Sequence, residues 1–246
     1  MSDPHFKTFD GTKYDYHGEC DMVMTTSSSF ASNLGFDLHI RTTIQDSYSF
    51  ISGAALRIGT DVLEVDAQDG TTVHFNNRTV SGATLPELFS GFPLSKKVLP
   101  HASTYKVRLG EYEVVSISSF KNMLKVQVNA ILPDASGLMG TSGKPGLVGR
   151  DGETTLSNME MGAEWQVRPG DHPTLFHTSR SPQFPEPCIL PASASTSRRL
   201  GENSALMRMA TTSCSGVGDF GEMKDCIFDV IQTGDVEMAL AYLGSE

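Results

Sequence analysis

Residues 36–44 read FDLHIRTTI, and this stretch decides the fold class of the chain. Apolar side chains occupy alternate positions along most of it, namely Phe36, Leu38, Ile40 and Ile44. A period of two places successive side chains on opposite faces of a β-strand, so that one face packs on a core and the other meets solvent. The stretch therefore predicts a strand that is buried on one face.

The same pattern recurs along the first two thirds of the chain. Alternating stretches lie at 61–67, 71–75, 104–110, 112–120 and 123–132. Turn-forming sequences such as AQDG, FNNR and LGEY separate them. Strand-like and helical stretches do not alternate as they do in parallel α/β folds. We therefore predict a mainly β fold, an antiparallel β-sandwich or a flattened barrel.

Length and charge narrow the class of protein. The chain has 246 residues and a formal net charge of -10, which suits one large β domain or two smaller ones. The acidic balance argues against a nucleic-acid partner and against an anionic membrane surface. No apolar run approaches the roughly 18 residues of a membrane helix, and none follows Met1 as in a signal peptide. We expect no membrane insertion.

The cysteines indicate the compartment. There are four, Cys20, Cys188, Cys214 and Cys226, and none lies in a CxxC pair that would suggest a zinc knuckle. An even, sparse set in a chain rich in Ser, Thr and Gly favours an oxidising compartment over four reduced thiols. Four cysteines allow three disulfide pairings, and their positions alone do not choose between them.

The last quarter of the chain has a different composition. Residues 178–197 are rich in Pro and Ser and predict an extended connector. Beyond it, apolar side chains adopt helical spacing at Met223, Ile227, Val230 and Ile231. Asp235 is the expected N-cap of a last helix. We predict a β-sandwich domain at 3–190, and a linker plus a small helical extension at 191–246.

Two motifs resemble one family. The stretch DPHFKTFDGTKYDYHGEC (3–20) resembles the opening of the von Willebrand factor type D domain. The glycine-rich GLMGTSGKPGLVGRDG (137–152), followed by the expected strand GAEWQV (162–167), is similar to the second signature of that family. The resemblance implies a secreted or surface-exposed β-sandwich, part of a larger precursor. Its expected role is a structural, adhesive or assembly module that binds other proteins or copies of itself, and not an enzyme.

The resemblance also implies disulfide pairs. By the family rule Cys20 bonds to Cys188, which leaves Cys214 with Cys226. The chain-entropy model gives a stabilisation of about 4–5 kcal/mol for the first of these bonds and about 3 kcal/mol for the second. The CGLC pair that the family uses for disulfide-linked multimers is absent, because Met139 occupies its second position. Association without a covalent bond is therefore expected.

The resemblance names candidate calcium ligands. Asp10 in the TFDG turn and Asp151 in the glycine-rich loop match the family's acidic positions, whereas Thr141, Gly143 and Arg150 depart from it. Calcium takes about six to eight oxygen ligands, so backbone carbonyls and water would complete the shell. Two alternatives stay open: Arg150 replaces the cation by bridging to Asp10, or local amides satisfy the Asp10 carboxylate. No other cofactor is expected.

The Asp3-Pro4 bond is a second candidate site. Some members of the resembled family break the equivalent bond by themselves at mildly acidic pH, and His5 is the side chain that titrates in this range. Ser2 stands where the family has glycine. An ordinary first strand with proline at its start is the alternative.

The remaining motifs are sparse. The histidines form no HxH or HExxH unit and no GxSxG elbow occurs, so we assign no catalytic residue. A secreted lectin or hydrolase would need a concave cluster of acidic, basic or aromatic residues that the sequence does not reveal. Asn77 begins the sole N-glycosylation sequon. Trp165 is expected in the core.

Overall fold

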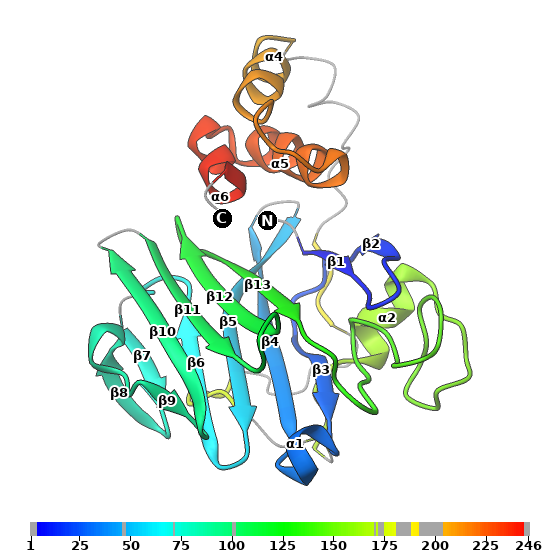
Figure 1. Cartoon of the computed structure of the whole chain (residues 1–246). Coiled ribbons are helices and arrows are strands. Elements are labelled where there is room, and N and C mark those ends of the chain that lie inside the picture. The colour runs from blue at the N-terminus through cyan, green and yellow to red at the C-terminus, as the bar shows by residue number, and fades with distance from the viewer. Residues whose placement is uncertain are drawn as a thin grey trace.

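The computed structural model describes residues 4–45, 48–70, 72–99, 102–169, 171, 175–180, 188–191 and 204–243. Within these residues the chain forms 13 strands in three antiparallel sheets, with a few helices, most of them near its C-terminal end. Two large sheets face each other across one hydrophobic core, and the helical extension lies beyond one end of them (Figure 1). The predicted mainly β, antiparallel sandwich is confirmed.

The six-stranded sheet follows chain order. Its strands are β3 (Asp21–Ser27), β4 (Phe36–Gln45), β5 (Tyr48–Ile58), β6 (Asp61–Asp66), β7 (Thr72–Phe75) and β8 (Arg78–Ser81). β4 contains the stretch predicted from its alternation, and its side chains Phe36, Leu38 and Ile40 are fully buried. The intervening Asp37 is also buried, because Arg57 on β5 holds its carboxylate.

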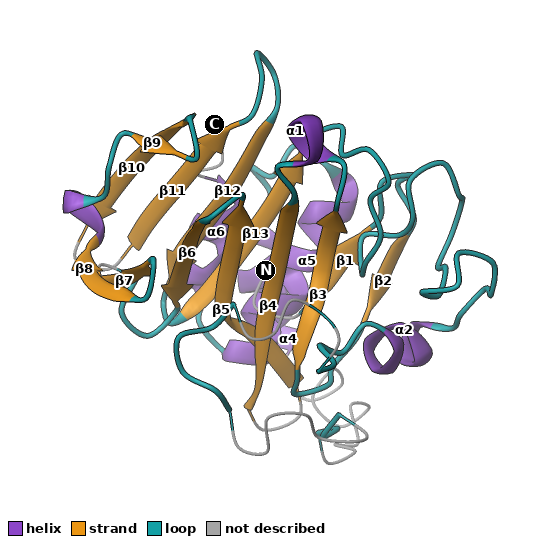
Figure 2. Ribbon diagram, turned by 90° about the horizontal axis from the view of Figure 1, so that it is seen from below, coloured by secondary structure: helices purple, strands orange, loops and turns teal. Residues whose placement is uncertain are grey.

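The five-stranded sheet is a second meander. Its strands are β9 (Leu88–Phe89), β10 (Phe92–Leu99), β11 (Ala102–Arg108), β12 (Val114–Phe120) and β13 (Met123–Asn129). Tyr105, Ile117 and Leu124 point from it into the core shared with β4 and β5. Figure 2 shows the two sheets as layers seen from below. Since alternate residues face opposite sides, the other face of this sheet is the outer one.

A small hairpin and a short helix flank the six-stranded sheet. The hairpin pairs β1 (His5–Lys7) with β2 (Lys13–Asp15), and the TFDG turn joins its strands. Helix α2 (Asn158–Glu164) begins at a capping box in which Ser157 and Glu160 satisfy each other's backbone N–H groups.

The expected strand at 162–167 is wrong in part. The capping box starts a helix whose last turn includes Gly162, so only the isolated bridge between Met22 and Gln166 has strand character. Trp165 is buried in the core, as predicted.

The helical extension comprises α4 (Ser204–Ser213), α5 (Phe220–Thr233), the 3-10 turn η2 (Val236–Ala239) and α6 (Leu240–Leu243). Its buried apolar side chains form one cluster with Tyr48 and Met123 of the sandwich. Asp235 caps η2 by accepting the Glu237 N–H at 2.9 Å, as its sequence position predicts. Two shorter elements, α1 (Phe30–Asn33) and η1 (Gly82–Thr84), connect strands elsewhere. Among all the residues that the structure describes, no helix is both long and apolar enough to cross a lipid bilayer.

Charged and aromatic groups also join the extension to the sandwich. On one side, the ammonium of Lys121 in the β12–β13 turn lies 2.5 Å from the carboxylates of both Asp235 and Glu237. On the other, the ring of Phe228 meets the ring of His5 edge-on, with 5.7 Å between centroids. The boundary predicted at 190/191 stays a prediction, because residues 192–203 lie outside the described part.

Candidate functional site

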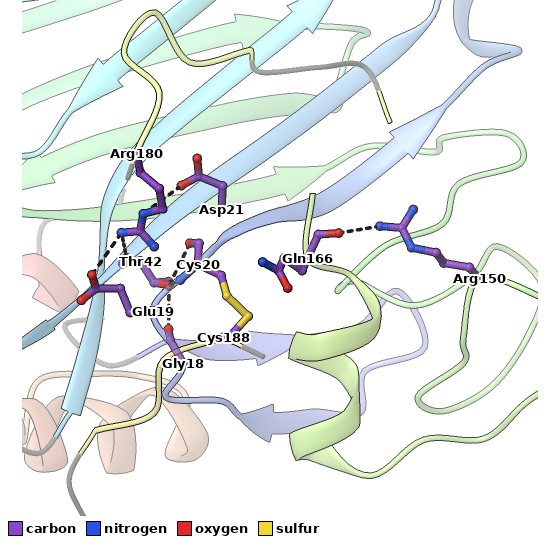
Figure 3. Close-up of a disulfide and its surroundings, with 9 residues drawn as sticks. All are labelled: Gly18, Glu19, Cys20, Asp21, Thr42, Arg150, Gln166, Arg180 and Cys188. Atoms are coloured by element: carbon purple, nitrogen blue, oxygen red, sulfur yellow. Dashed lines mark hydrogen bonds and ion pairs between the residues drawn. A yellow bond between two sulfur atoms is a disulfide. The ribbon is translucent and has the colours of Figure 1, made fainter. Parts of the chain in front are cut away.

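The first disulfide ties the opening of the sandwich to the end of the domain (Figure 3). It joins Cys20 to Cys188, 168 positions apart, which is the pair that the resemblance implies. Both cysteines are buried, and the neighbouring Glu19 N–H donates to the Ile189 carbonyl at 2.7 Å. The bond therefore anchors the residues just before β3 to a distant segment.

Polar contacts surround this disulfide. The Thr42 hydroxyl donates to the Gly18 carbonyl at 2.7 Å and accepts the Cys20 N–H at 3.1 Å (Figure 3). The guanidinium of Arg180 lies 3.5 Å from Glu19 and 3.8 Å from Asp21. These contacts hold the segment that carries Arg180 against the six-stranded sheet.

The second disulfide lies inside the extension. It joins Cys214, directly after α4, to Cys226 within α5, again the pair that the resemblance implies. Both sulfurs are buried in the apolar cluster of the extension. No described cysteine is free.

Asp10 lies in the TFDG turn and connects that turn to the glycine-rich loop. One carboxylate oxygen accepts the Thr8 hydroxyl and, at 3.1 Å, the Thr12 N–H. The other accepts the Thr12 hydroxyl at 3.2 Å and the Gly146 N–H at 2.7 Å. These bonds, the one from Thr8 foremost, hold the pKa of Asp10 well below its usual range. The carboxylate is therefore ionised and satisfied by four protein donors.

Asp151 forms a separate local turn. Its carboxylate accepts the N–H groups of Glu153 and Thr154 at 2.9 Å and the Thr154 hydroxyl at 2.5 Å. These bonds, chiefly from Thr154, lower the pKa of Asp151 to about 2.

The two aspartates do not form a ready calcium cage. A carboxylate offers about four lone-pair sites, and protein donors already use that many on Asp10. Across the described residues, no cluster of three or more His, Cys, Asp or Glu side chains is arranged to hold a metal ion. A calcium ion at Asp10 would have to displace donors and rely on backbone oxygens. Calcium binding at Asp10 and Asp151 stays a prediction.

Arg150 does not bridge to Asp10, so that alternative is wrong. Its guanidinium pairs with both carboxylate oxygens of Asp171, at 2.7 and 3.0 Å. It also donates to the carbonyls of Glu164 and Gln166, and it lies 4.8 Å from the ring centroid of Trp165. Glu164 is the last residue of α2 and the other partners follow that helix, so Arg150 fastens the glycine-rich loop to the end of α2 and to the segment after it.

The backbone of the glycine-rich loop fits closely against β3. Gly137 has φ +151°, and a Cβ atom there would lie 2.5 Å from the Met24 carbonyl oxygen, so glycine is required. The Tyr14 hydroxyl donates to the Leu138 carbonyl at 2.6 Å, and the Phe9 N–H donates to Met139 at 2.9 Å. The two sequence motifs therefore meet in space, which their separation along the chain does not reveal.

His5 lies between the hairpin and the extension. Its Nδ1 is 2.6 Å from the Asp15 carboxylate and 4.0 Å from Asp225 on α5. Burial lowers the pKa of His5, but the hydrogen bond to Asp15 and the charges of Asp225 and Asp229 outweigh it, so the net shift is upward. Asp3 lies outside the described residues, so cleavage of the Asp3-Pro4 bond stays a prediction.

Asn77 sits in the tight turn between β7 and β8, where its φ is +60° and its side chain is exposed. This position leaves room for a glycan. Glycosylation of Asn77 stays a prediction.

The comparison with known families agrees with this geometry. The model of the von Willebrand factor type D domain matches residues 1–130, which include the opening motif, the first disulfide's Cys20 and all thirteen strands. The glycine-rich loop and α2 follow the matched range. No curated protein matches the sequence. The family is one of extracellular adhesive and assembly modules. The match covers more than half of the chain, which therefore belongs to the von Willebrand factor type D domain family.

Proposed function

We propose that the chain is a non-enzymatic interaction and assembly module of a larger secreted or surface protein. The observation that carries this proposal is the family match over residues 1–130. Two disulfides support a place outside the reducing cytosol. The described residues offer no specific observation in favour of self-cleavage, or of a hydrolase.

Association of this module is non-covalent. The four cysteines are used in two bonds within the chain, which leaves no described thiol for a bond between chains. Apolar side chains are available instead: Tyr112 and Ile131 are 79% and 82% exposed. They lie on adjacent segments, since Asn129 donates to the Tyr112 carbonyl at 3.1 Å. Neighbouring exposed apolar side chains are common in contact surfaces between proteins.

Sedimentation velocity of the full chain tests self-assembly. We expect a reversible increase in sedimentation coefficient across a micromolar concentration range, unaffected by a thiol-blocking reagent. The substitution Ile131→Asp is expected to weaken this association, because it places a charge in the apolar contact. Met159→Asp is the matched control, since Met159 is also exposed but lies on α2. A chain that stays monomeric at every concentration would contradict self-assembly.

Calcium binding is a separate part of the proposal. We expect calorimetric titration to give weak binding, with a dissociation constant of about 0.1–1 mM, because few carboxylates are available. Asp10→Ala should abolish the heat. Asp134→Ala is the control, because Asp134 is another exposed turn aspartate held by hydroxyl donors, here Ser28 and Ser29. The absence of heat from the unaltered chain at millimolar calcium would end this part of the proposal.

A further inference from the structure

A groove of about 460 Å³ lies where the outer face of the five-stranded sheet meets the helical extension. We call it the sheet–helix groove. Its floor is formed by the outward side chains of β10 to β13, and part of its wall by Met238, Leu240 and Ala241 of η2 and α6. Figure 1 shows α6 next to the ends of β11 and β12.

Strand register concentrates positive charge on the floor. Lys97 on β10 lies opposite Thr104 on β11, which lies opposite Ser118 on β12, which lies opposite Lys125 on β13. Lys106 on β11 belongs to the next outward row. Three ammonium groups and several hydroxyls therefore share one face.

The three lysines differ in exposure. Lys97 and Lys106 are exposed, whereas Lys125 is only 8% exposed and its ammonium lies 5.3 Å from the ring centroid of Tyr242 on α6. Docking of the extension thus covers Lys125 and leaves the other two at the rim of the groove.

The charge of the groove opposes the charge of the chain. The sequence has 29 acidic residues against 19 Lys and Arg, yet no acidic residue is among the described residues that line the groove. Lys97 and Lys106 form no ion pair with a described carboxylate. A cationic groove on an acidic molecule attracts a short anionic ligand, whereas the like net charges of two whole chains oppose the approach of a second copy.

The wall of the groove selects among anions. Leu240 is 55% exposed, and Phe120 and Met123 continue its apolar surface onto the sheet. A hydrophilic polyanion would leave this surface in contact with water. A peptide with both acidic and apolar side chains places carboxylates over the lysines and buries an apolar group against Leu240, at roughly 25 cal/mol per Å² of apolar area.

We propose that the sheet–helix groove binds an acidic peptide segment of a partner protein that also carries an apolar side chain. This inference rests on the proposed function, because it names the partner of the same interaction module. The extension is part of the site, since it supplies the wall and is held in place by the contacts of Lys121 with Asp235 and Glu237.

Fluorescence anisotropy of a labelled synthetic peptide of Asp, Glu and Leu tests the groove on the full chain. We expect saturable binding that weakens as salt rises. The double substitution Lys97→Gln with Lys106→Gln should raise the dissociation constant about tenfold, because it removes two ammonium charges from the rim of the groove. Lys7→Gln with Arg78→Gln is the matched control, because it removes the same charge from exposed positions of β1 and β8.

A second variant tests the wall. Leu240→Ser should weaken binding of the Leu-containing peptide about fivefold and should leave binding of an all-acidic peptide unchanged. This side chain is exposed, so its replacement does not open a core cavity.

Three results would overturn the proposal: no peptide binding, binding equally reduced by the control pair, or a sulfated polysaccharide that binds the groove while the peptide does not. Loss of self-association in Lys97→Gln with Lys106→Gln would likewise overturn it, because a second copy would then be the occupant. If the chain self-associates but does not bind the peptide, the groove proposal is wrong and the proposed assembly function stands. If the chain stays monomeric but binds the peptide, only the proposal of self-assembly is wrong.

Discussion

Replacement of Cys20 and Cys188 by alanine is expected to lower the free energy of unfolding by about 5 kcal/mol, the largest effect of any change considered for this chain. The bond closes a loop of 168 positions, so its loss restores much conformational freedom to the unfolded chain. The folded state also loses the link between the start of β3 and the segment at 188–191.

Urea unfolding followed by tryptophan fluorescence measures this effect. Trp165 is the only tryptophan and is buried in the sandwich core, so its emission reports on that core. The control pair is Cys214→Ala with Cys226→Ala, which opens a loop of only 12 positions and is expected to cost about 3 kcal/mol. Its effect should appear in hydrogen exchange of α4 and α5. An unchanged urea midpoint for the Cys20 and Cys188 variant would contradict the prediction.

The substitution Arg150→Ala is expected to lower the free energy of unfolding by about 3 kcal/mol. It removes a bidentate partner from Asp171, whose side chain is only 19% exposed. It also leaves the carbonyls of Glu164 and Gln166 without their guanidinium donor and takes the cation from the Trp165 ring. Unpaired acceptors in a partly buried site cost more than the lost attraction itself.

Two further variants separate geometry from charge. Arg150→Lys keeps the charge but loses the planar guanidinium fork. We therefore expect it to lower the free energy of unfolding by about half as much as Arg150→Ala does. Arg168→Ala breaks the exposed pair with Glu164 and should cost less than about 1 kcal/mol. Thermal unfolding and Trp165 fluorescence compare the three variants. Equal effects of Arg150→Ala and Arg168→Ala would show that Arg150 has no special structural role.

Part of the fold was predictable because its pattern is local. β4 and β12 carry the alternation typical of strands, and both form close to the predicted bounds. The prediction that β4 is buried on one face only is wrong, because Asp37 and His39 on its other face are buried as well. β5 was missed because polar and apolar residues do not alternate regularly along it, and side chains on both of its faces are buried. The reason is tertiary: Leu175 and Phe176 cover Ala55 on the outer face, so that face is buried too.

The candidate cation site was likewise predictable only in part. The sequence placed Asp10 in a turn, since an Asp-Gly pair favours one, and Asp151 in the glycine-rich loop. It did not reveal that Gly146 donates to Asp10, or that Arg150 selects Asp171 instead. Those partners come from segments brought together by the core, and no local pattern encodes which donor reaches which carboxylate.

The antiparallel β class, the two cysteine pairs and the N-cap at Asp235 could all be inferred from the residues alone, the cysteine pairs through the family resemblance. These depend on local periodicity, on a motif, or on one residue and its neighbour. The sheet–helix groove, by contrast, is visible only in the folded chain. Lys97, Lys125 and Leu240 are far apart along the chain, and they meet because strand register and the docking of α6 are set by side-chain packing over the whole molecule.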